Sequence, residues 1–231
     1  MIGIVIPAHN EQHGLRDCLA SIQLAAGHPD LQGEDVAILV VLDACTDASA
    51  MIAASLGVAT LTIGARNVGR ARAAGADHQL AAGARWLAFT DADTVVSPDW
   101  LVAQLGLRAE AVCGTVSVGD WSPHGAQLER VRRHFAEHYL DADGHRHIHG
   151  ANMGVSAHAY RRAGGFPPLA LSEDVALVEA LLAVGVDIAW SALPRVTTSA
   201  RLDARAAGGF GDTLRGYAAG AQSGVVQLLP G

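Results

Sequence analysis

The sequence predicts a doubly wound α/β fold, in which helices cover both faces of a mostly parallel sheet. Apolar segments of strand length alternate with helical segments through the first hundred residues. The strand segments are apolar throughout, which is typical of parallel strands buried on both faces. Polar residues follow three of these segments, at the edge where open α/β sheets bind ligands.

The predicted strands of this region are short apolar runs that stop at a proline or a polar residue. The first starts beside the N-terminus and stops before Pro7, and the fourth, Trp86-Leu87-Ala88-Phe89, stops at Thr90. Because strands are usually short and end at such residues, each run is assigned as one strand. The expected strands are residues 2–6, 36–42, 58–63 and 86–91.

Helical segments connect these strands. The first places Leu15, Cys18, Leu19 and Ile22 on one face, which is the spacing of an amphipathic helix. The third is rich in alanine, the strongest helix former. The expected helices are residues 11–26, 46–56 and 68–82.

Beyond Pro98 the pattern is less regular. We expect a strand at 111–118, a polar helix at 124–139, a loop at 141–144, a helix after Ser172 and a short strand at 186–190. No internal repeat or low-complexity linker divides the chain. We therefore expect one domain over residues 1–231, with two halves that meet near residue 95.

Composition excludes several classes of function. All sixteen basic residues are arginine, so chemistry that needs a lysine, such as Schiff-base formation, is excluded. The net charge of −7 and the lack of a basic block argue against a nucleic-acid partner. The three cysteines are far apart, which indicates free thiols in a reducing compartment. With no signal peptide and no apolar run of about 18 residues, we expect no transmembrane segment and a cytoplasmic location, including the inner membrane face.

Two acids, Asp91 and Asp93, follow the fourth predicted strand. Residues two apart on an extended segment point the same way, so these carboxylates repel unless a cation lies between them. Oxygen ligands suit Mg²⁺ or Mn²⁺. Acids also follow the first two strands, at Glu11 and Asp43. Helix capping explains Glu11 in part, but not the convergence of the other three on one edge.

Six motifs follow one another along the chain: I-V-I-P-A-H-N-E (4–11), L-D-A-C-T-D (42–47), R-N-V-G-R-A-R-A-A-G (66–75), F-T-D-A-D (89–93), H-G-A-N-M-G (149–154) and S-E-D (172–174). In this order they resemble the family 2 glycosyltransferases, which have the GT-A fold, over about residues 2–190. The resemblance implies a nucleotide-sugar-binding half at residues 1–95 and an acceptor-binding half at residues 96–231. It also implies an inverting hexosyltransferase that uses a nucleotide sugar, with a UDP-sugar as the expected donor, and Mn²⁺ or Mg²⁺ as cofactor.

The resemblance assigns roles to particular residues. Asp93 is the expected direct metal ligand. Asp91 is expected to contribute to the metal site and to bind the nucleotide sugar. Asp174 is the expected general base, beside Glu173. The residues expected to bind the nucleotide sugar are Pro7, Ala8, Asn10, Glu11, Asp43, Arg72, Asp91 and Ala92. The residues expected to line the site of the acceptor, a hydroxyl-bearing small molecule or a lipid-linked compound, are His149, Gly150 and Asn152.

The chemistry of single displacement at an anomeric carbon fits these assignments independently. A base deprotonates the acceptor hydroxyl and a metal stabilises the departing diphosphate, so acids are needed at two places. The alternative for residues 172–174 is a helix start with two acids in the first turn, and we expect Ser172 to cap that helix in either case. The Q-x-x-R-W motif of processive members is missing, which favours transfer of a single sugar.

Two further groups stay open. His145, His147 and His149 share one face if the segment is a strand, a spacing that suits Zn²⁺, although a solvated polar loop or strand is the favoured interpretation. Arg201 and Arg205 are candidates to pair with a diphosphate, against the alternative of ordinary exposed arginines.

Two alternative functions remain. In a haloacid-dehalogenase-type phosphatase Asp91 would be the nucleophile, but that motif normally lies on the first strand and its partner lysine is missing. A non-catalytic sugar-nucleotide-binding protein is the other alternative, and Asp174 beside an intact D-x-D argues against it.

Overall fold

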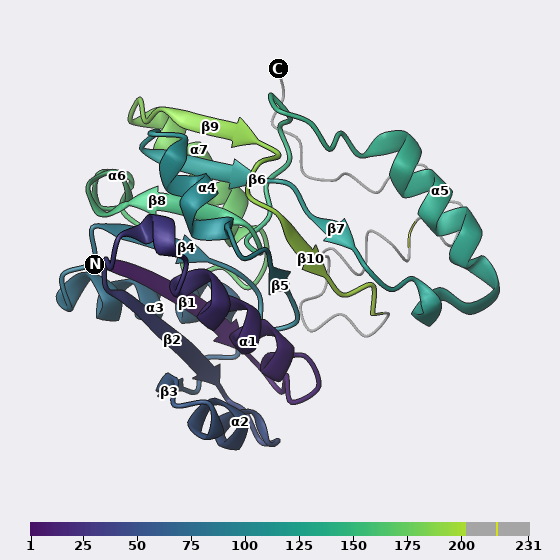
Figure 1. The fold of residues 1–231 in the computed structure, drawn as a ribbon, viewed down its shortest axis with the longest axis horizontal. Helices are drawn as coiled ribbons and strands as arrows, with labels where there is room; N and C mark the ends of the chain where they lie inside the picture. The colour runs from purple at the N-terminus through teal and green to yellow at the C-terminus, as the bar shows by residue number, and fades with distance from the viewer. Residues whose placement is uncertain (202–215, 217–231) are drawn as a thin grey trace.

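A seven-stranded sheet forms the centre of the computed structural model, which describes residues 1–201 and Gly216 (Figure 1). The strand order is β3-β2-β1-β4-β8-β6-β9, and every strand is parallel to β1 except β8, which is antiparallel to β4 and β6. The strands are β1 (Ile2–Ala8), β2 (Val36–Asp43), β3 (Ala59–Ile63), β4 (Trp86–Phe89), β6 (Ala111–Gly114), β8 (Met153–Ser156) and β9 (Ile188–Ser191). The prediction of a doubly wound, mostly parallel sheet is confirmed.

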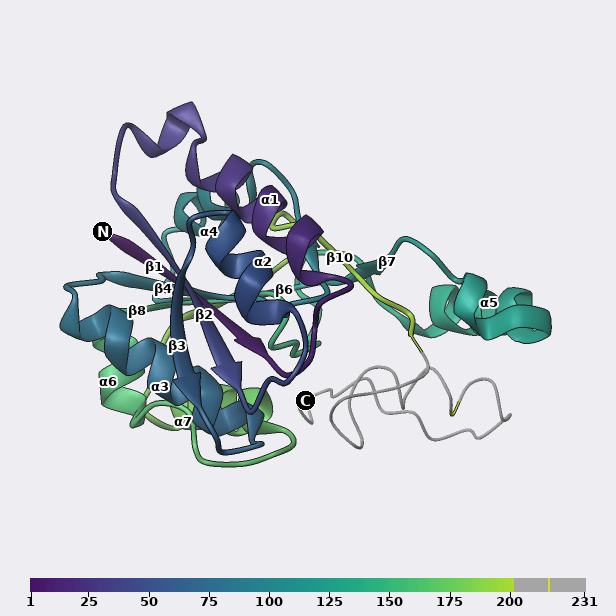
Figure 2. The same cartoon turned by 90° about the horizontal axis from the view of Figure 1, so that it is seen from below.

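Helices cover both faces of this sheet (Figure 2). One layer contains α1 (Leu15–Ala26), α2 (Ser49–Ser55) and α4 (Trp100–Gly106). The other contains α3 (Val68–Ala81), α6 (Ala157–Ala163) and α7 (Glu173–Ala183). The sheet is therefore the middle of three layers, and strands from both predicted halves of the chain lie in it.

Alternate residues of β1 show how the two layers are built. Ile2, Ile4 and Ile6 belong to the core cluster that contains the buried face of α1, whereas Val5 belongs to the cluster on the α3 side. All four side chains are fully buried. On the α3 side a Cβ at Gly75 would overlap the Val5 side chain, so glycine allows α3 to approach β1 closely.

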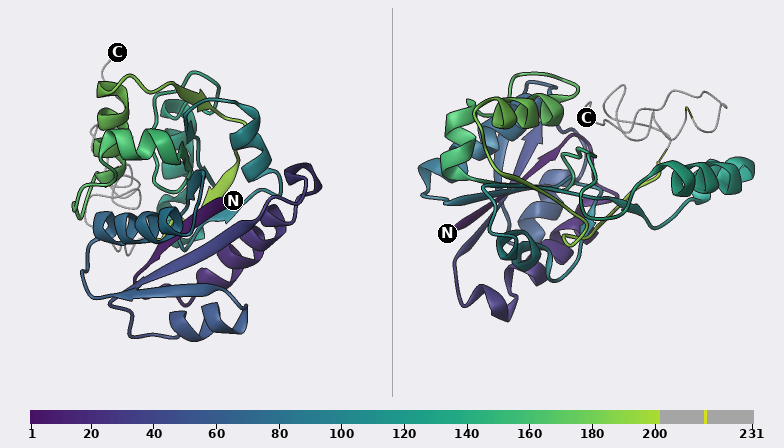
Figure 3. Two further views of the ribbon diagram at one scale, coloured as in Figure 1. Left: turned by 90° about the vertical axis from the view of Figure 1, so that its left-hand side faces the viewer. Right: turned by 90° about the horizontal axis from the view of Figure 1, so that it is seen from above.

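A smaller three-stranded sheet lies beside the main one, in the order β5-β10-β7. Its strands are β5 (Val95–Val96), β10 (Val196–Thr198) and β7 (Ser117–Val118). After β7 the chain forms a short 3-10 helix, η2 (Ser122–Gln127), and then α5 (Leu128–His138). The helix α5 stands apart from the two helix layers (Figures 1 and 3). Because β5 begins two residues after Asp93, this sheet connects the D-x-D segment to the last described strand.

Several expected elements differ from the structure. The strand expected at 111–118 is two strands in different sheets. Between them the side-chain NH₂ of Asn152 donates a hydrogen bond to the carbonyl oxygen of Thr115 at 2.7 Å, which interrupts the ladder. The helix expected from residue 11 begins at Leu15. The helix α4, the strand β8 and the helix α6 were not expected. Within the described residues, no helix has both the length and the apolar character that a membrane span requires.

Candidate active site

The loops that follow β1 and β2 are tied together at the carboxyl edge of the sheet. The side-chain oxygen of Asn10 accepts a hydrogen bond from the backbone N–H of Thr46 at 2.8 Å. The backbone N–H of Glu11 donates to the hydroxyl of Ser49 at 2.9 Å. Asn10 has a φ of 56°, a conformation that asparagine tolerates better than most residues. These contacts hold two of the predicted nucleotide-binding residues, Asn10 and Glu11, in fixed positions.

Asp43, at the end of β2, holds the turn that precedes α3. Its carboxylate accepts three backbone hydrogen bonds, from Ala65 at 2.7 Å, Arg66 at 2.8 Å and Asn67 at 2.7 Å. Asn67 in turn caps α3, because its side chain accepts a hydrogen bond from the backbone N–H of Arg70. Asp43 thus has a structural role that the sequence did not indicate, and its contact with a nucleotide stays a prediction.

Arg72 is a fully buried arginine that joins distant parts of the chain. Its guanidinium donates from Nη2 to Asp91 Oδ1 at 2.6 Å and from Nε to Glu173 Oε1 at 3.0 Å. Its Nη1 donates to the carbonyl oxygen of Gly150 at 2.9 Å. A Cβ at Gly150 would lie 2.7 Å from Arg72 Cζ, so this close approach requires glycine. Arg72 therefore brings the D-x-D segment, the loop before β8 and the start of α7 together.

Asp174 lies beside this cluster, in the first turn of α7. One of its oxygens accepts from the backbone N–H of Gly150 at 2.8 Å, and the other from the backbone N–H of Val175 at 2.9 Å. Burial raises the pKa of Asp174 above its usual range, and the positive charge of Arg72 opposes that rise. Burial likewise raises the pKa of Glu173. Ser172 occupies the N-cap position of α7 with a φ of 59°, but its hydroxyl does not cap the helix, so the capping prediction is wrong.

The two acids of the D-x-D segment have different surroundings. The side chain of Asp91 is 38% exposed and pairs with Arg72, whereas that of Asp93 is 16% exposed and lies 3.3 Å from the Nε of Arg201. Burial raises the pKa of Asp93 to about 7, against the lowering effect of Arg201. Asp93 therefore faces a cation of the protein itself.

The carboxylates of Asp91 and Asp93 fit a divalent cation that is held partly by the substrate. Mg²⁺ is usually held by one or two carboxylates together with the phosphates of a substrate. In the part of the chain that the structure describes, no three His, Cys, Asp or Glu side chains are grouped to hold a metal ion. The donor set of Asp91 and Asp93 thus suits a cation that a bound diphosphate helps to hold, and does not form a complete cage.

The three predicted acceptor-site residues lie in the loop before β8. Asn152 is fully buried, and its side chain is hydrogen-bonded to Trp100, Thr115 and Pro194 at 2.7–2.9 Å. This gives it a structural role. Gly150 contacts both Arg72 and Asp174, as described above. The acceptor-binding roles of these residues stay predictions.

The three alternating histidines are packed into the protein. His145 and His147 are each 1% exposed, so the expectation of a solvated loop or strand is wrong. The ring of Tyr139 stacks on His147 with centroids 4.1 Å apart, and its hydroxyl lies 3.0 Å from His149 Nε2. That hydroxyl also accepts a hydrogen bond from the backbone N–H of Val116 at 2.7 Å. Burial lowers the pKa of His147 to about 4 and that of His149 to about 3.

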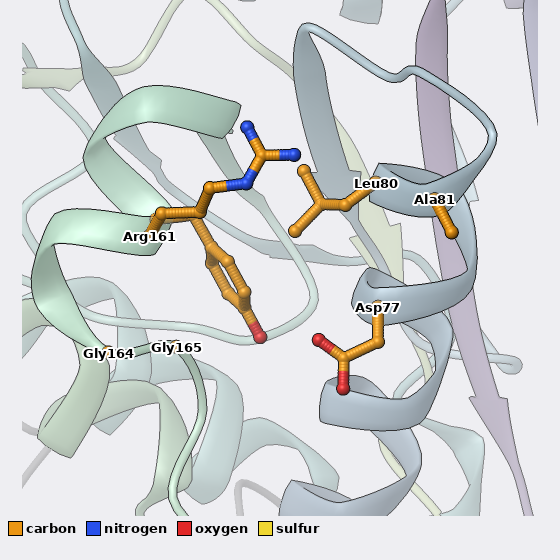
Figure 4. A pocket seen from close by; sticks show the side chains of 7 residues that line it. Asp77, Leu80, Ala81, Arg161, Gly164 and Gly165 are labelled. Carbon is orange, nitrogen blue, oxygen red and sulfur yellow. The ribbon is translucent and has the colours of Figure 1, made fainter.

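A surface pocket lies elsewhere, between the end of α3 and α6 (Figure 4). Its lining includes Asp77, Leu80 and Arg161, and none of the predicted site residues. It is unrelated to the cluster around Arg72.

The structure brings five of the predicted residues together in one cluster. Arg72 connects Asp91, Glu173 and Gly150, and Gly150 connects this set to Asp174. Pro7 and Ala8 are the last residues of β1, and Ala92 lies between the two acids of the D-x-D.

Two contacts of the site were not predicted from the sequence. One is the pairing of Arg201 with Glu11 and Asp93, because Arg201 was expected only as a candidate partner of a diphosphate. The other is the contact of the start of α3 with the loop at Leu169, where the backbone N–H of Gly69 donates to the Leu169 carbonyl at 2.9 Å. Arg205 lies outside the described residues.

The sequence matches the model of one protein family, described as "Glycosyl transferase family 2", over residues 3–164. No curated protein is significantly similar to it in sequence.

Solved structures with the same fold are similar to this chain at low sequence identity. Glucosyl-3-phosphoglycerate synthase from Mycobacterium tuberculosis, in complex with Mn²⁺, UDP-glucose and phosphoglyceric acid, matches with a TM-score of 0.60 and 18% identity over 86% of this chain and 71% of that one. The mannosyltransferase PcManGT from Pyrobaculum calidifontis, in complex with GDP-Man and Mn²⁺, matches with a TM-score of 0.59 and 18% identity over 84% of this chain and 57% of that one. S. aureus TarS 1-349, in complex with UDP-GlcNAc, matches with a TM-score of 0.59 and 13% identity over 85% of this chain and 58% of that one.

These similarities confirm the predicted GT-A fold. The chain spans about 60% of the length of the S. aureus TarS 1-349 structure.

Proposed function

The chain belongs to glycosyl transferase family 2, and from that premise we propose that it transfers one sugar from a nucleotide sugar, a UDP-sugar, to a hydroxyl acceptor with inversion. The observation that carries this proposal is the cluster around Arg72. The carboxyl edge of the sheet, which we call the donor edge, contributes Asp91, and the start of α7 contributes Glu173 and Asp174. The guanidinium of Arg72 and the backbone of Gly150 join these acids. Transfer with inversion requires acids at both places.

Asp174 is the general base in this proposal. Burial raises its pKa, which brings a carboxylate closer to the pH at which a base works best. The backbone N–H of Gly150 holds one of its oxygens, so the carboxylate has a defined orientation toward the loop that contains the predicted acceptor residues. Glu173 neutralises and orients Arg72.

The donor lies at the carboxyl edge of β1, β2 and β4. Asp93 would hold Mn²⁺ or Mg²⁺ with support from Asp91, and the bound cation would supply charge neutralisation for the departing diphosphate. The loops of Asn10 and Asp43 are fixed by their hydrogen bonds, so they provide a preformed edge for the nucleotide. The relatives with UDP, UDP-GlcNAc and GDP-Man support a nucleotide-sugar donor. A lipid-linked acceptor and a location at the inner membrane face stay predictions.

The phosphatase alternative has less support. Asp91 would have to act as a nucleophile, but one of its oxygens is paired with Arg72 at 2.6 Å. Membership of a glycosyl transferase family also argues against it.

The experiment is a donor panel. UDP-glucose, UDP-GlcNAc and GDP-mannose are added with Mn²⁺, with Mg²⁺ or with EDTA, and thermal stabilisation and nucleotide release are measured. We expect one UDP-sugar to stabilise the protein with a divalent cation and to release UDP. If no nucleotide sugar stabilises the protein with either metal, the proposed function is wrong.

Asp174→Asn tests the proposed base. Because the substitution keeps the size of the side chain, we expect donor binding to persist and transfer to fall by about 10²–10⁴-fold. Glu179→Gln, at an exposed position of the same helix, is the matched control and should keep wild-type turnover. Unchanged turnover in Asp174→Asn would remove Asp174 from the role.

A further inference from the structure

Arg201, the residue at the end of the continuous described chain, reaches into the donor edge. Its guanidinium forms a two-pronged ion pair with Glu11, with Nη1–Oε2 and Nη2–Oε1 distances of 2.5 and 2.7 Å. Its Nε lies 3.3 Å from Asp93 Oδ2. The side chains of Glu11 and Asp93 are only 8% and 16% exposed. One guanidinium therefore lies against two nearly buried carboxylates that come from different strand ends.

The small sheet holds the backbone near Arg201 in place. β10 pairs with β5 on one side and β7 on the other. The hydroxyl of Thr198, at the end of β10, lies 3.0 Å from that of Thr94, the residue directly after Asp93. The backbone N–H of Ser97 donates to the carbonyl oxygen of Arg195 at 2.9 Å. Arg201 and the D-x-D segment are thus fixed relative to each other by neighbouring strands.

Two guanidinium groups each pair with two acids of the site. Arg72 pairs with Asp91 and Glu173, and Arg201 pairs with Glu11 and Asp93. The side chain of Arg72 is 3% exposed and that of Arg201 is 27% exposed. The pair made by Arg201 is the more accessible one, and it includes the carboxylate that the proposed function assigns to the metal.

We propose that Arg201 is the resident cation of the donor site, which holds Glu11 and Asp93 until a divalent cation that binds Asp93 displaces it. This inference rests on the proposed function, because it assigns the metal to Asp93. An arginine is always charged, and two cations repel each other strongly at one nearly buried carboxylate. Arg201 and the metal therefore exclude each other at Asp93. Once displaced, the guanidinium is available to pair with the diphosphate of the donor.

Competition makes a prediction for metal binding alone. A metal that displaces Arg201 from Asp93 must break both the contact of its Nε with Asp93 and its two-pronged pair with Glu11, and its binding is weakened by that cost. Removal of the guanidinium charge in Arg201→Gln should therefore raise the affinity for Mn²⁺, in the absence of nucleotide, by about tenfold or more. Arg201→Lys keeps a charge but loses the planar fork, and its affinity should rise by a smaller factor, about threefold.

The experiment is a titration of the purified chain with Mn²⁺, followed by electron paramagnetic resonance of the free ion. Arg195→Gln is the matched control. Arg195 lies just before β10 and pairs with Asp141, away from the donor edge, so its loss should leave Mn²⁺ affinity unchanged. Thermal unfolding of each variant establishes that it is folded. If Arg201→Gln does not fold, Arg201→Lys carries the test.

Three results would overturn the inference: an affinity in Arg201→Gln equal to or below that of the wild type, an equal rise in Arg195→Gln, or unchanged affinity in Arg201→Lys where that variant carries the test. None of them touches the proposed function, which is tested separately by stabilisation and nucleotide release with the donor panel. Conversely, a protein that no nucleotide sugar stabilises contradicts the proposed function, whatever its affinity for Mn²⁺.

Discussion

Arg72 is the residue whose removal tests the construction of the site most severely. Arg72→Met keeps an unbranched side chain of similar length but removes the charge and three hydrogen bonds. The carboxylate of Glu173, 7% exposed, is then left without the guanidinium that neutralises it. Asp91 is 38% exposed and can be hydrated instead. The cost is therefore dominated by Glu173.

The size of this effect follows from the burial of the pair. Removal of one partner from a buried ion pair typically costs about 3–5 kcal/mol. Because Asp91 regains water, only the loss of the Glu173 pair counts, and Arg72→Met should lower the free energy of unfolding by about 4 kcal/mol at pH 8. The cost should shrink at lower pH, because an unpaired buried carboxyl takes up a proton, by up to about 1.4 kcal/mol per pH unit.

The assay is urea unfolding at pH 8 and pH 6 for the wild type, Arg72→Met and Arg72→Met/Glu173→Gln. The double variant should recover about half of the loss, because the buried charge is gone. Arg70→Met, at an exposed position of the same helix, is the matched control and should cost less than about 0.5 kcal/mol. A loss in Arg72→Met below about 1 kcal/mol, or no recovery in the double variant, would refute the argument.

Three further predictions concern the supports of the site. Asp43→Asn replaces an oxygen that accepts backbone N–H groups with an NH₂ donor, and should cost about 2 kcal/mol in urea unfolding; an unchanged midpoint would contradict its role. Gly69→Ala places a Cβ 2.5 Å from the Leu169 carbonyl oxygen and should cost about 1–3 kcal/mol, where a neutral result would show that the loop yields freely. His149 has a pKa lowered to about 3, so the unfolded chain takes up a proton below pH 6.5 while the folded chain does not, and stability is lost as the pH falls. Between pH 6.5 and 5 the wild type should lose about 1.5 kcal/mol more than His149→Gln, and parallel pH profiles would show that the ring is not held neutral.

The sequence predicted the strands and helices of the first hundred residues because their signal is local. An uninterrupted apolar run such as Trp86–Phe89 has few alternatives to a buried strand, and the alanine-rich segment after Asn67 has a strong helix propensity and a cap. The strand β8 was missed because it is four residues long and contains Gly154, so it has no pattern of its own. It is specified by pairing with β4 and β6 on both sides.

The acids of the site were predictable one by one, but their partners were not. Arg72 and Glu173 are 101 residues apart, and Glu11 and Arg201 are 190 residues apart. Only the tertiary fold decides which guanidinium meets which carboxylate. The prediction for the histidines was wrong for a related reason. Their polarity suggested exposure to solvent, whereas the ring of Tyr139 covers His147 and its hydroxyl is hydrogen-bonded to His149.

The proposed function depends most on the D-x-D segment, which is expected to bind the diphosphate of a nucleotide together with a metal. A calorimetric titration of UDP in the presence of Mn²⁺ tests this with the wild type, Asp93→Asn and the exposed control Asp99→Asn. We expect wild-type affinity in the control, a fall of at least about tenfold in Asp93→Asn, and no further loss in that variant when EDTA replaces Mn²⁺. Equal affinity for UDP in the wild type and Asp93→Asn, with the same sensitivity to EDTA, would contradict the account.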